Sequence, residues 1–288
     1  MNIPGLNTNA TRMLTGLILG TIALACIVYG GFALLALLAV VIYFGTVEYV
    51  KILEYKGFYP SLRTMFGAEI ILAAVAYYSR QDLVAIALTI CTMGAFMWVL
   101  FRGRQPYIAN VATTILGFVY AGWFPLHLLF LRKLSSPVYN DGLGFVIMMF
   151  TIILLTDIGS YYTGKKFGKH KLAPVISPNK TIEGSVGGSL WAVAGALLVG
   201  LVLGVEWSHC IIIGLLCTAA AQLGDLSESL IKRDAGVKDS GDALPGHGGF
   251  MDRTDSFIFT IPVMYYYCKY FIFSDSAVMI LKHIQELI

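Results

Sequence analysis

The chain has 288 residues, of which 57% are hydrophobic and 13% charged, and its mean hydropathy is +0.75. Soluble globular proteins are usually about 25% charged. The composition therefore excludes a water-soluble fold and predicts an all-α, polytopic integral membrane protein. The net charge of +3 is too small and too dispersed to indicate a nucleic-acid-binding protein. The five cysteines form no CxxC pair, which argues against a zinc site or a disulfide framework.

About nine apolar stretches are long enough to be transmembrane helices, each of which needs about 20 apolar residues. In chain order they are 13–29, 32–50, 65–79, 83–101, 107–131, 143–163, 185–204, 210–231 and 254–273, followed by a short amphipathic tail at 277–288. We expect an N-terminal part of about five spans, residues 1–140. The C-terminal catalytic region, residues 141–288, then contains two polar loops, 164–184 and 232–253.

The basic residues predict the orientation of these spans. With nine spans, 15 of the 20 lysines and arginines share one side with the N-terminus. The other five are Arg80, Arg132, Lys133, Lys269 and Lys282. Since cytoplasmic loops are enriched in lysine and arginine, we expect the N-terminus and both polar loops to face the cytoplasm.

The 164–184 loop and the helix before it carry the first cluster of polar residues. Asp157 lies late in an apolar stretch, where an ionisable group needs a functional or structural reason to be retained. Ser177 followed by Pro178 predicts a helix start. Lys180 and Thr181 beside such a helix N-terminus would suit a phosphate group. The alternative is a basic loop attracted to anionic lipid head groups.

The 232–253 loop and its flanking helices carry a denser cluster. Asp225, Ser229, Lys232 and Arg233 are spaced so that they share one face of a helix. Such a polar face would line a cavity. The loop that follows is rich in glycine and includes Lys238, Asp239 and His247, of which His247 is placed to donate to a phosphate.

Acidic residues at the start of the last span suggest a metal ion. Asp252 and Asp255 are three residues apart and point the same way on a helix. Together with Asp225 they form a set of carboxylates that would repel one another without a cation. Mg²⁺ typically takes one or two protein carboxylates and completes its shell with water and substrate phosphates. The alternative is a set of salt bridges from Asp252 or Asp255 to the neighbouring bases Arg253, Lys232 and Arg233.

Residues 229–255, SLIKRDAGVKDSGDALPGHGGFMDRTD, resemble the motif of the CDP-diacylglycerol synthases, also called phosphatidate cytidylyltransferases. The first cluster is also similar to this family at Asp157, Tyr161, Gly164, 167–169, 177–178, 180–181 and 183–184. One departure is Ile182, where relatives usually carry tryptophan. The resemblance implies a Mg²⁺-dependent reaction of CTP with phosphatidic acid that yields CDP-diacylglycerol and pyrophosphate. It also implies a homodimer whose site opens to the cytoplasm. We expect the membrane to be a bacterial plasma membrane, with an organelle membrane as the alternative.

Carried over to this chain, the resemblance implies that Asp225 and Asp252 bind one or two divalent ions. As a hypothesis, Lys232, Arg233, Lys238 and Arg253 then bind the triphosphate or the leaving pyrophosphate. Ser177, Lys180 and Thr181 clamp the lipid phosphate. Asp157, Ser229 and His247 are further substrate-binding candidates, and Asp239 and Asp255 orient the other groups. The alternatives are a cytidylyltransferase for another lipid phosphate and, from a different class, a transporter.

Overall fold

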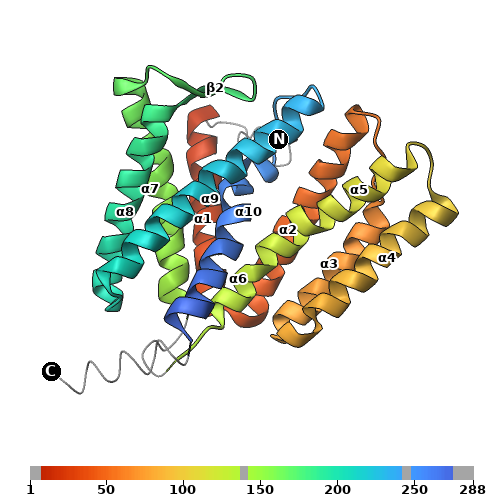
Figure 1. The fold of residues 1–288 in the computed structure, drawn as a ribbon, viewed down its shortest axis with the longest axis horizontal. Coiled ribbons are helices and arrows are strands. Elements are labelled where there is room, and N and C mark those ends of the chain that lie inside the picture. Colours follow the sequence, from red (N-terminus) through yellow and green to blue (C-terminus); the bar gives the residue numbers. More distant parts are fainter. Residues whose placement is uncertain (1–7, 137–141, 242–247, 275–288) are drawn as a thin grey trace. The chain divides into compact units, whose positions relative to one another are not determined.

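The computed structural model describes residues 8–136, 142–241 and 248–274 (Figure 1). Its α-helices are α1 (Thr8–Tyr29), α2 (Gly31–Tyr55), α3 (Leu62–Tyr77), α4 (Val84–Arg102), α5 (Tyr107–Gly117), α6 (Phe124–Arg132), α7 (Leu143–Phe167), α8 (Ile182–Leu203), α9 (Trp207–Asp234) and α10 (Met251–Tyr267). Short elements are the 3-10 turn η1 (Gln81–Leu83), the π-helical turns η2 (Phe118–Trp123) and η3 (Cys268–Ile272), and the strands β1 (Lys171–Ala173) and β2 (Ser177–Thr181).

The helices confirm an all-α membrane protein. Each of the nine predicted stretches coincides with a helical segment. The stretch 107–131 corresponds to α5, η2 and α6, which follow one another without a break. Six segments of the described chain are long and apolar enough to cross a membrane: α2, η1 with α4, α5 to α6, α7, α8 and α9. Helices α3 and α10 have only 16 and 17 residues. The count of nine spans and the orientation of the N-terminus therefore stay predictions.

The chain forms two compact units. Unit 1 comprises residues 1–129 and 228–254, and unit 2 comprises residues 130–227 and 255–288. Each unit thus combines segments that are far apart in the sequence. Asp225 belongs to unit 2, and Asp252 belongs to unit 1. The division at residue 140, which was drawn from the predicted spans, stays a prediction.

In unit 1, α3 lies beside α4 and also contacts α2, as the orange ribbons of Figure 1 show. Tyr49 is fully buried, and its hydroxyl donates to the backbone oxygen of Thr113 over 3.0 Å. A Cβ atom at Gly117 would come within 2.7 Å of the Tyr49 ring. Glycine at this position therefore allows α5 to approach α2 closely.

In unit 2, α7 and α8 run side by side along much of their length (Figure 1). Glycines make this contact possible. A Cβ atom at Gly159 would lie 2.8 Å from the Trp191 Cβ, and one at Gly184 would lie 2.8 Å from the Ser160 carbonyl oxygen. The close approach brings the polar C-terminal end of α7 beside the N-terminal end of α8.

Candidate functional site

The predicted helix start at Ser177 and Pro178 is wrong. Residues Ser177–Thr181 form β2, which pairs antiparallel with β1 and places Lys171 opposite Thr181. Pairing with β1 keeps this segment extended, and proline is tolerated in a strand at a sheet edge. Helix α8 begins instead at Ile182, where the Thr181 hydroxyl accepts a hydrogen bond from the Gly184 N–H over 3.1 Å. Thr181 is therefore the N-cap.

The side chain of Glu183 ties the end of α7 to the start of α8. Its carboxylate accepts the backbone N–H of Lys169 over 3.0 Å and that of His170 over 3.2 Å. It also lies 2.6 Å from the His170 ring nitrogen. A negative charge in the first turn of a helix is favourable. Glu183 thus fixes both ends of the hairpin that carries β1 and β2.

A pocket of about 510 Å³ opens between these elements within unit 2. Four predicted site residues line it: Asp157, Lys180, Thr181 and Asp225. Residues of the first polar cluster and Asp225 therefore line the same pocket. Ser185 and Gln222 are among the lining residues that were not predicted: the Ser185 hydroxyl donates to the Gln222 side-chain oxygen, and the Gln222 amide donates to the Ser185 backbone oxygen over 3.2 Å.

Lys180 and Asp225 form an ion pair across this pocket. The ammonium nitrogen lies 2.5 Å from an Asp225 carboxylate oxygen, and both side chains are 28% exposed. A partly exposed pair can exchange its partners for a charged ligand, because neither ion is sealed from water. With Asp157 and Lys165, which also line it, the pocket therefore offers both acidic and basic groups to a ligand that carries phosphate and a bound cation.

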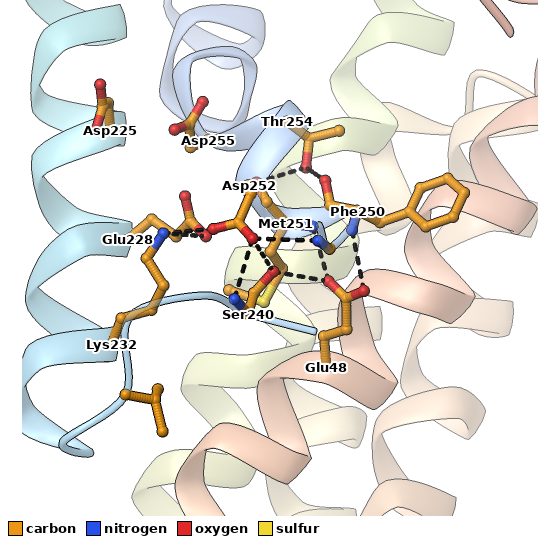
Figure 2. Close-up of polar contacts among 12 residues, drawn as sticks. Glu48, Asp225, Glu228, Lys232, Ser240, Phe250, Met251, Asp252, Thr254 and Asp255 are labelled. Carbon is orange, nitrogen blue, oxygen red and sulfur yellow. Dashed lines mark hydrogen bonds and ion pairs between the residues drawn. The ribbon is translucent and has the colours of Figure 1, made fainter. Parts of the chain in front are cut away.

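In unit 1 the Asp252 carboxylate is surrounded by donors (Figure 2). One oxygen lies 2.5 Å from the Lys232 ammonium. The other accepts from the Ser240 N–H over 3.0 Å, the Ser240 hydroxyl over 2.9 Å and the Gly249 N–H over 3.2 Å. Burial alone would raise the pKa of Asp252, but the hydrogen bonds from Lys232 and Ser240 outweigh it, so the pKa lies below its ordinary value.

Lys232 also pairs with Glu228, one turn earlier on α9. The nitrogen-to-oxygen distance is 3.2 Å, and the Glu228 side chain is fully buried. Of the salt bridges considered as the alternative for Asp252, the one to Lys232 is therefore present. Sequence reasoning did not select Glu228, although a charged residue inside a predicted span is the signal that could have identified it.

Helix α9 is continuous through Asp234, which confirms the helical spacing assumed for Asp225, Ser229, Lys232 and Arg233. Lys238, Asp239 and Arg253 have exposed side chains, and Asp255 is half-buried. An Arg233 guanidinium nitrogen donates to the Val237 carbonyl oxygen over 3.2 Å. His247 lies outside the described residues. The roles assigned to all of these residues stay predictions.

The carboxylates have the donor chemistry for Mg²⁺. Among the described residues no group of three or more histidine, cysteine, aspartate and glutamate side chains is arranged to hold a metal. A Mg²⁺ site needs only one or two carboxylates when substrate phosphates supply further oxygens. Asp225 and Asp252 are partly exposed hard oxygen donors. These residues therefore fit a metal that binds together with its substrate, which stays a prediction.

Comparison with known proteins identifies a family and several relatives of this chain. Residues 10–271 match the sequence pattern of the cytidylyltransferase family. A phosphatidate cytidylyltransferase of Synechocystis sp. is 36% identical over 285 residues, which cover 89% of this chain and 95% of that protein. Phosphatidate cytidylyltransferases of Staphylococcus aureus and Staphylococcus epidermidis are 48% and 46% identical over 127 residues, which cover 43% of this chain and 49% of each relative.

Proposed function

Because the chain belongs to the cytidylyltransferase family, we propose that it converts CTP and phosphatidate into CDP-diacylglycerol and pyrophosphate. The observation that carries this proposal is the similarity to the Synechocystis enzyme over nearly the full length of both chains. The pocket of unit 2 supports it, since lysine and aspartate face the same space in a protein with membrane-spanning helices.

The chemistry is a single displacement at phosphorus. An oxygen of the phosphatidate phosphate attacks the α-phosphorus of CTP in line. The new P–O bond forms as the bond to pyrophosphate breaks. Such reactions depend on positioning and on neutralising the phosphate charges, so no covalent enzyme intermediate is required.

The site residues have two tasks in this proposal. Lys232, Arg233, Lys238 and Arg253 bind the triphosphate or the leaving pyrophosphate, and arginine suits bidentate contacts. Ser177, Lys180 and Thr181 bind the lipid phosphate, with Asp157, Ser229 and His247 as further substrate contacts. Asp239 and Asp255 orient these groups. Asp225 and Asp252 supply oxygens to one or two Mg²⁺ ions, which when bound neutralise phosphate charge.

The membrane arrangement is part of the same proposal. Nine spans with a cytoplasmic N-terminus place the 164–184 and 232–253 loops on the cytoplasmic side of a bacterial plasma membrane, where CTP is available. The same arrangement places the C-terminus on the opposite side of the membrane. A reporter enzyme that is active only after export should therefore be active when it is fused to the C-terminus. The resemblance to the family also supports a homodimer, which light scattering of the detergent-solubilised protein would test.

The activity is tested directly with purified protein in detergent micelles. Labelled CTP should enter a chloroform-extractable product only when phosphatidate and Mg²⁺ are present. A product formed with an isoprenoid phosphate but not with phosphatidate would indicate the alternative lipid substrate. No lipid product with either phosphate would contradict the proposed function.

Lys180→Ala should raise the apparent KM for phosphatidate about tenfold and change the KM for CTP much less, because one charged hydrogen bond to the lipid phosphate contributes about 1.5–3 kcal/mol. Initial rates at varied concentrations of each substrate measure this. Lys171→Ala is the matched control, since Lys171 is exposed on β1 and does not line the pocket. The opposite ranking of the two KM values would assign Lys180 to the nucleotide.

A further inference from the structure

Glu48 in α2 is a buried carboxylate far from both polar clusters in the sequence. Only 4% of the residue's surface is exposed to solvent. Its two oxygens accept the backbone N–H groups of Phe250 and Met251, each over 2.9 Å (Figure 2). The first N–H groups of a helix have no partner within that helix. Glu48 therefore caps the start of α10 from another segment of unit 1.

The same carboxylate reaches the loop that precedes α10. The Ser240 hydroxyl lies 3.1 Å from a Glu48 oxygen and 2.9 Å from the Asp252 oxygen. A hydroxyl has one hydrogen, so it donates to one of these oxygens at a time. The Ser240 hydroxyl therefore links the Glu48 carboxylate to the Asp252 carboxylate. The Ser240 N–H donates to Asp252 as well. Ser240 is thus held between Glu48 on one side and Asp252 on the other.

The backbone after Ser240 and before α10 approaches the Glu48 carboxylate closely. A Cβ atom at Gly249 would lie 2.6 Å from a Glu48 oxygen, and one at Gly241 would lie 3.1 Å from the other. On the preceding turn of α2, Phe44 stacks on Phe250 with ring centroids 4.7 Å apart and 6° between the planes. Helix α2 therefore contacts the start of α10 through both a charge and an aromatic ring.

We propose that Glu48 is a positioning residue that fixes the Asp252 carboxylate for catalysis. It orients both groups that donate to the second Asp252 oxygen, namely Ser240 and the backbone that leads from Gly249 into α10. Asp252 itself, with Lys232, makes the functional contact. This inference rests on the catalytic role proposed for Asp252. It assigns a function to the N-terminal helices, where the motifs indicate none.

The test compares Glu48→Gln with Glu54→Gln, which removes the same charge from an exposed position on α2. The amide that Glu48→Gln introduces would direct donor hydrogens at a backbone N–H or at the Ser240 hydroxyl. We expect kcat per folded, monodisperse enzyme to fall about 10- to 100-fold, as for other residues that orient a metal ligand. The KM for CTP should change less than about threefold. Glu54→Gln should keep wild-type kinetics.

Hydrogen exchange of the metal-free, nucleotide-free protein provides a readout that does not depend on activity. The amides of Phe250 and Met251 should exchange faster in Glu48→Gln than in the wild type. Faster exchange with an unchanged kcat would mean that Glu48 only stabilises the fold, and the inference would be overturned. Unchanged exchange would overturn it too, because Glu48 would then not hold these amides.

A second route uses Ser240→Ala, which removes the hydroxyl between the two carboxylates without removing a charge. The kcat of Ser240→Ala should fall about tenfold. In the double variant, Glu48→Gln should lower kcat by a smaller factor than it does alone, since both residues act on the Asp252 carboxylate. Full additivity would overturn the inference, and so would a wild-type kcat for Ser240→Ala. This variant and Glu48→Asp carry the test if Glu48→Gln does not fold.

The outcome for Asp252→Asn separates this inference from the function on which it rests. An inactive Asp252→Asn enzyme beside a fully active Glu48→Gln enzyme would remove only the role of Glu48. An active Asp252→Asn enzyme would remove the catalytic role of Asp252, and the role of Glu48 with it.

Discussion

Asp225→Asn is expected to reduce the formation of CDP-lipid by about 1,000-fold or more, since a metal ion contributes several kcal/mol to the stabilisation of charge in the transition state. Asparagine keeps the shape of the side chain but loses the charge that attracts Mg²⁺. Transfer of label from CTP to the lipid phase measures the loss. Raising the Mg²⁺ concentration should restore little activity.

Asp234→Asn is the matched control for this experiment. Asp234 lies on the same helix, α9, and its carboxylate likewise pairs with a lysine, Lys56, over 3.0 Å. Both partners of that pair are exposed, so its loss should cost less than about 1 kcal/mol. Near-normal turnover by Asp225→Asn would remove the metal-site proposal. A similar loss in both variants would point to the charge of α9 rather than to the site.

Asp252→Asn should also inactivate the enzyme, but the structure makes it a less selective change. Asp252 accepts from Lys232, from Ser240 and from the Gly249 N–H. Asparagine presents two N–H donors in place of one oxygen, and they would oppose donors already in place. The variant therefore perturbs the 232–253 loop in addition to any metal contact. Asp225, which pairs with Lys180 across the pocket of unit 2, gives the clearer result.

The sequence was sufficient for most of the helices, and it indicated four of the residues that line the pocket of unit 2. Long apolar runs have few alternatives in a bilayer, because every backbone polar group must be satisfied within a helix. The segments around Asp157, Lys180 and Asp225 carry charges that an apolar environment disfavours, which marked them as functional. Their convergence on one pocket agrees with that interpretation.

Two features could not be predicted from local residue preferences because they depend on contacts with another segment of the chain, near in one case and distant in the other. Local cap and proline rules placed a helix start at Ser177, but pairing with β1 outweighed them. Glu48 lies 202 residues before Phe250, and nothing in the local pattern of α2 indicates which backbone it contacts. An acidic residue inside an apolar stretch was a usable signal. That signal could have identified Glu48 but not the backbone groups that it contacts.

Lys232→Met is expected to destabilise the protein by about 3–5 kcal/mol, because removing one partner leaves an uncompensated charge in a buried ion pair. Lys232 contacts both Glu228 and Asp252, and the Glu228 side chain is fully buried. Thermal unfolding in detergent should show a clear loss. Lys56→Met, which breaks the exposed pair with Asp234, should cost less than about 1 kcal/mol.

Adding Glu228→Gln to Lys232→Met separates the two tasks of the lysine. The second substitution removes the buried negative charge that the first leaves without its ammonium partner. It should therefore recover most of the lost stability, since removing both charges costs less than removing one. Activity should not return, because no ammonium remains for the phosphates or for orienting Asp252. A stable and active double variant would show that Lys232 only neutralises Glu228, and the four-residue triphosphate site proposed above would lose this member.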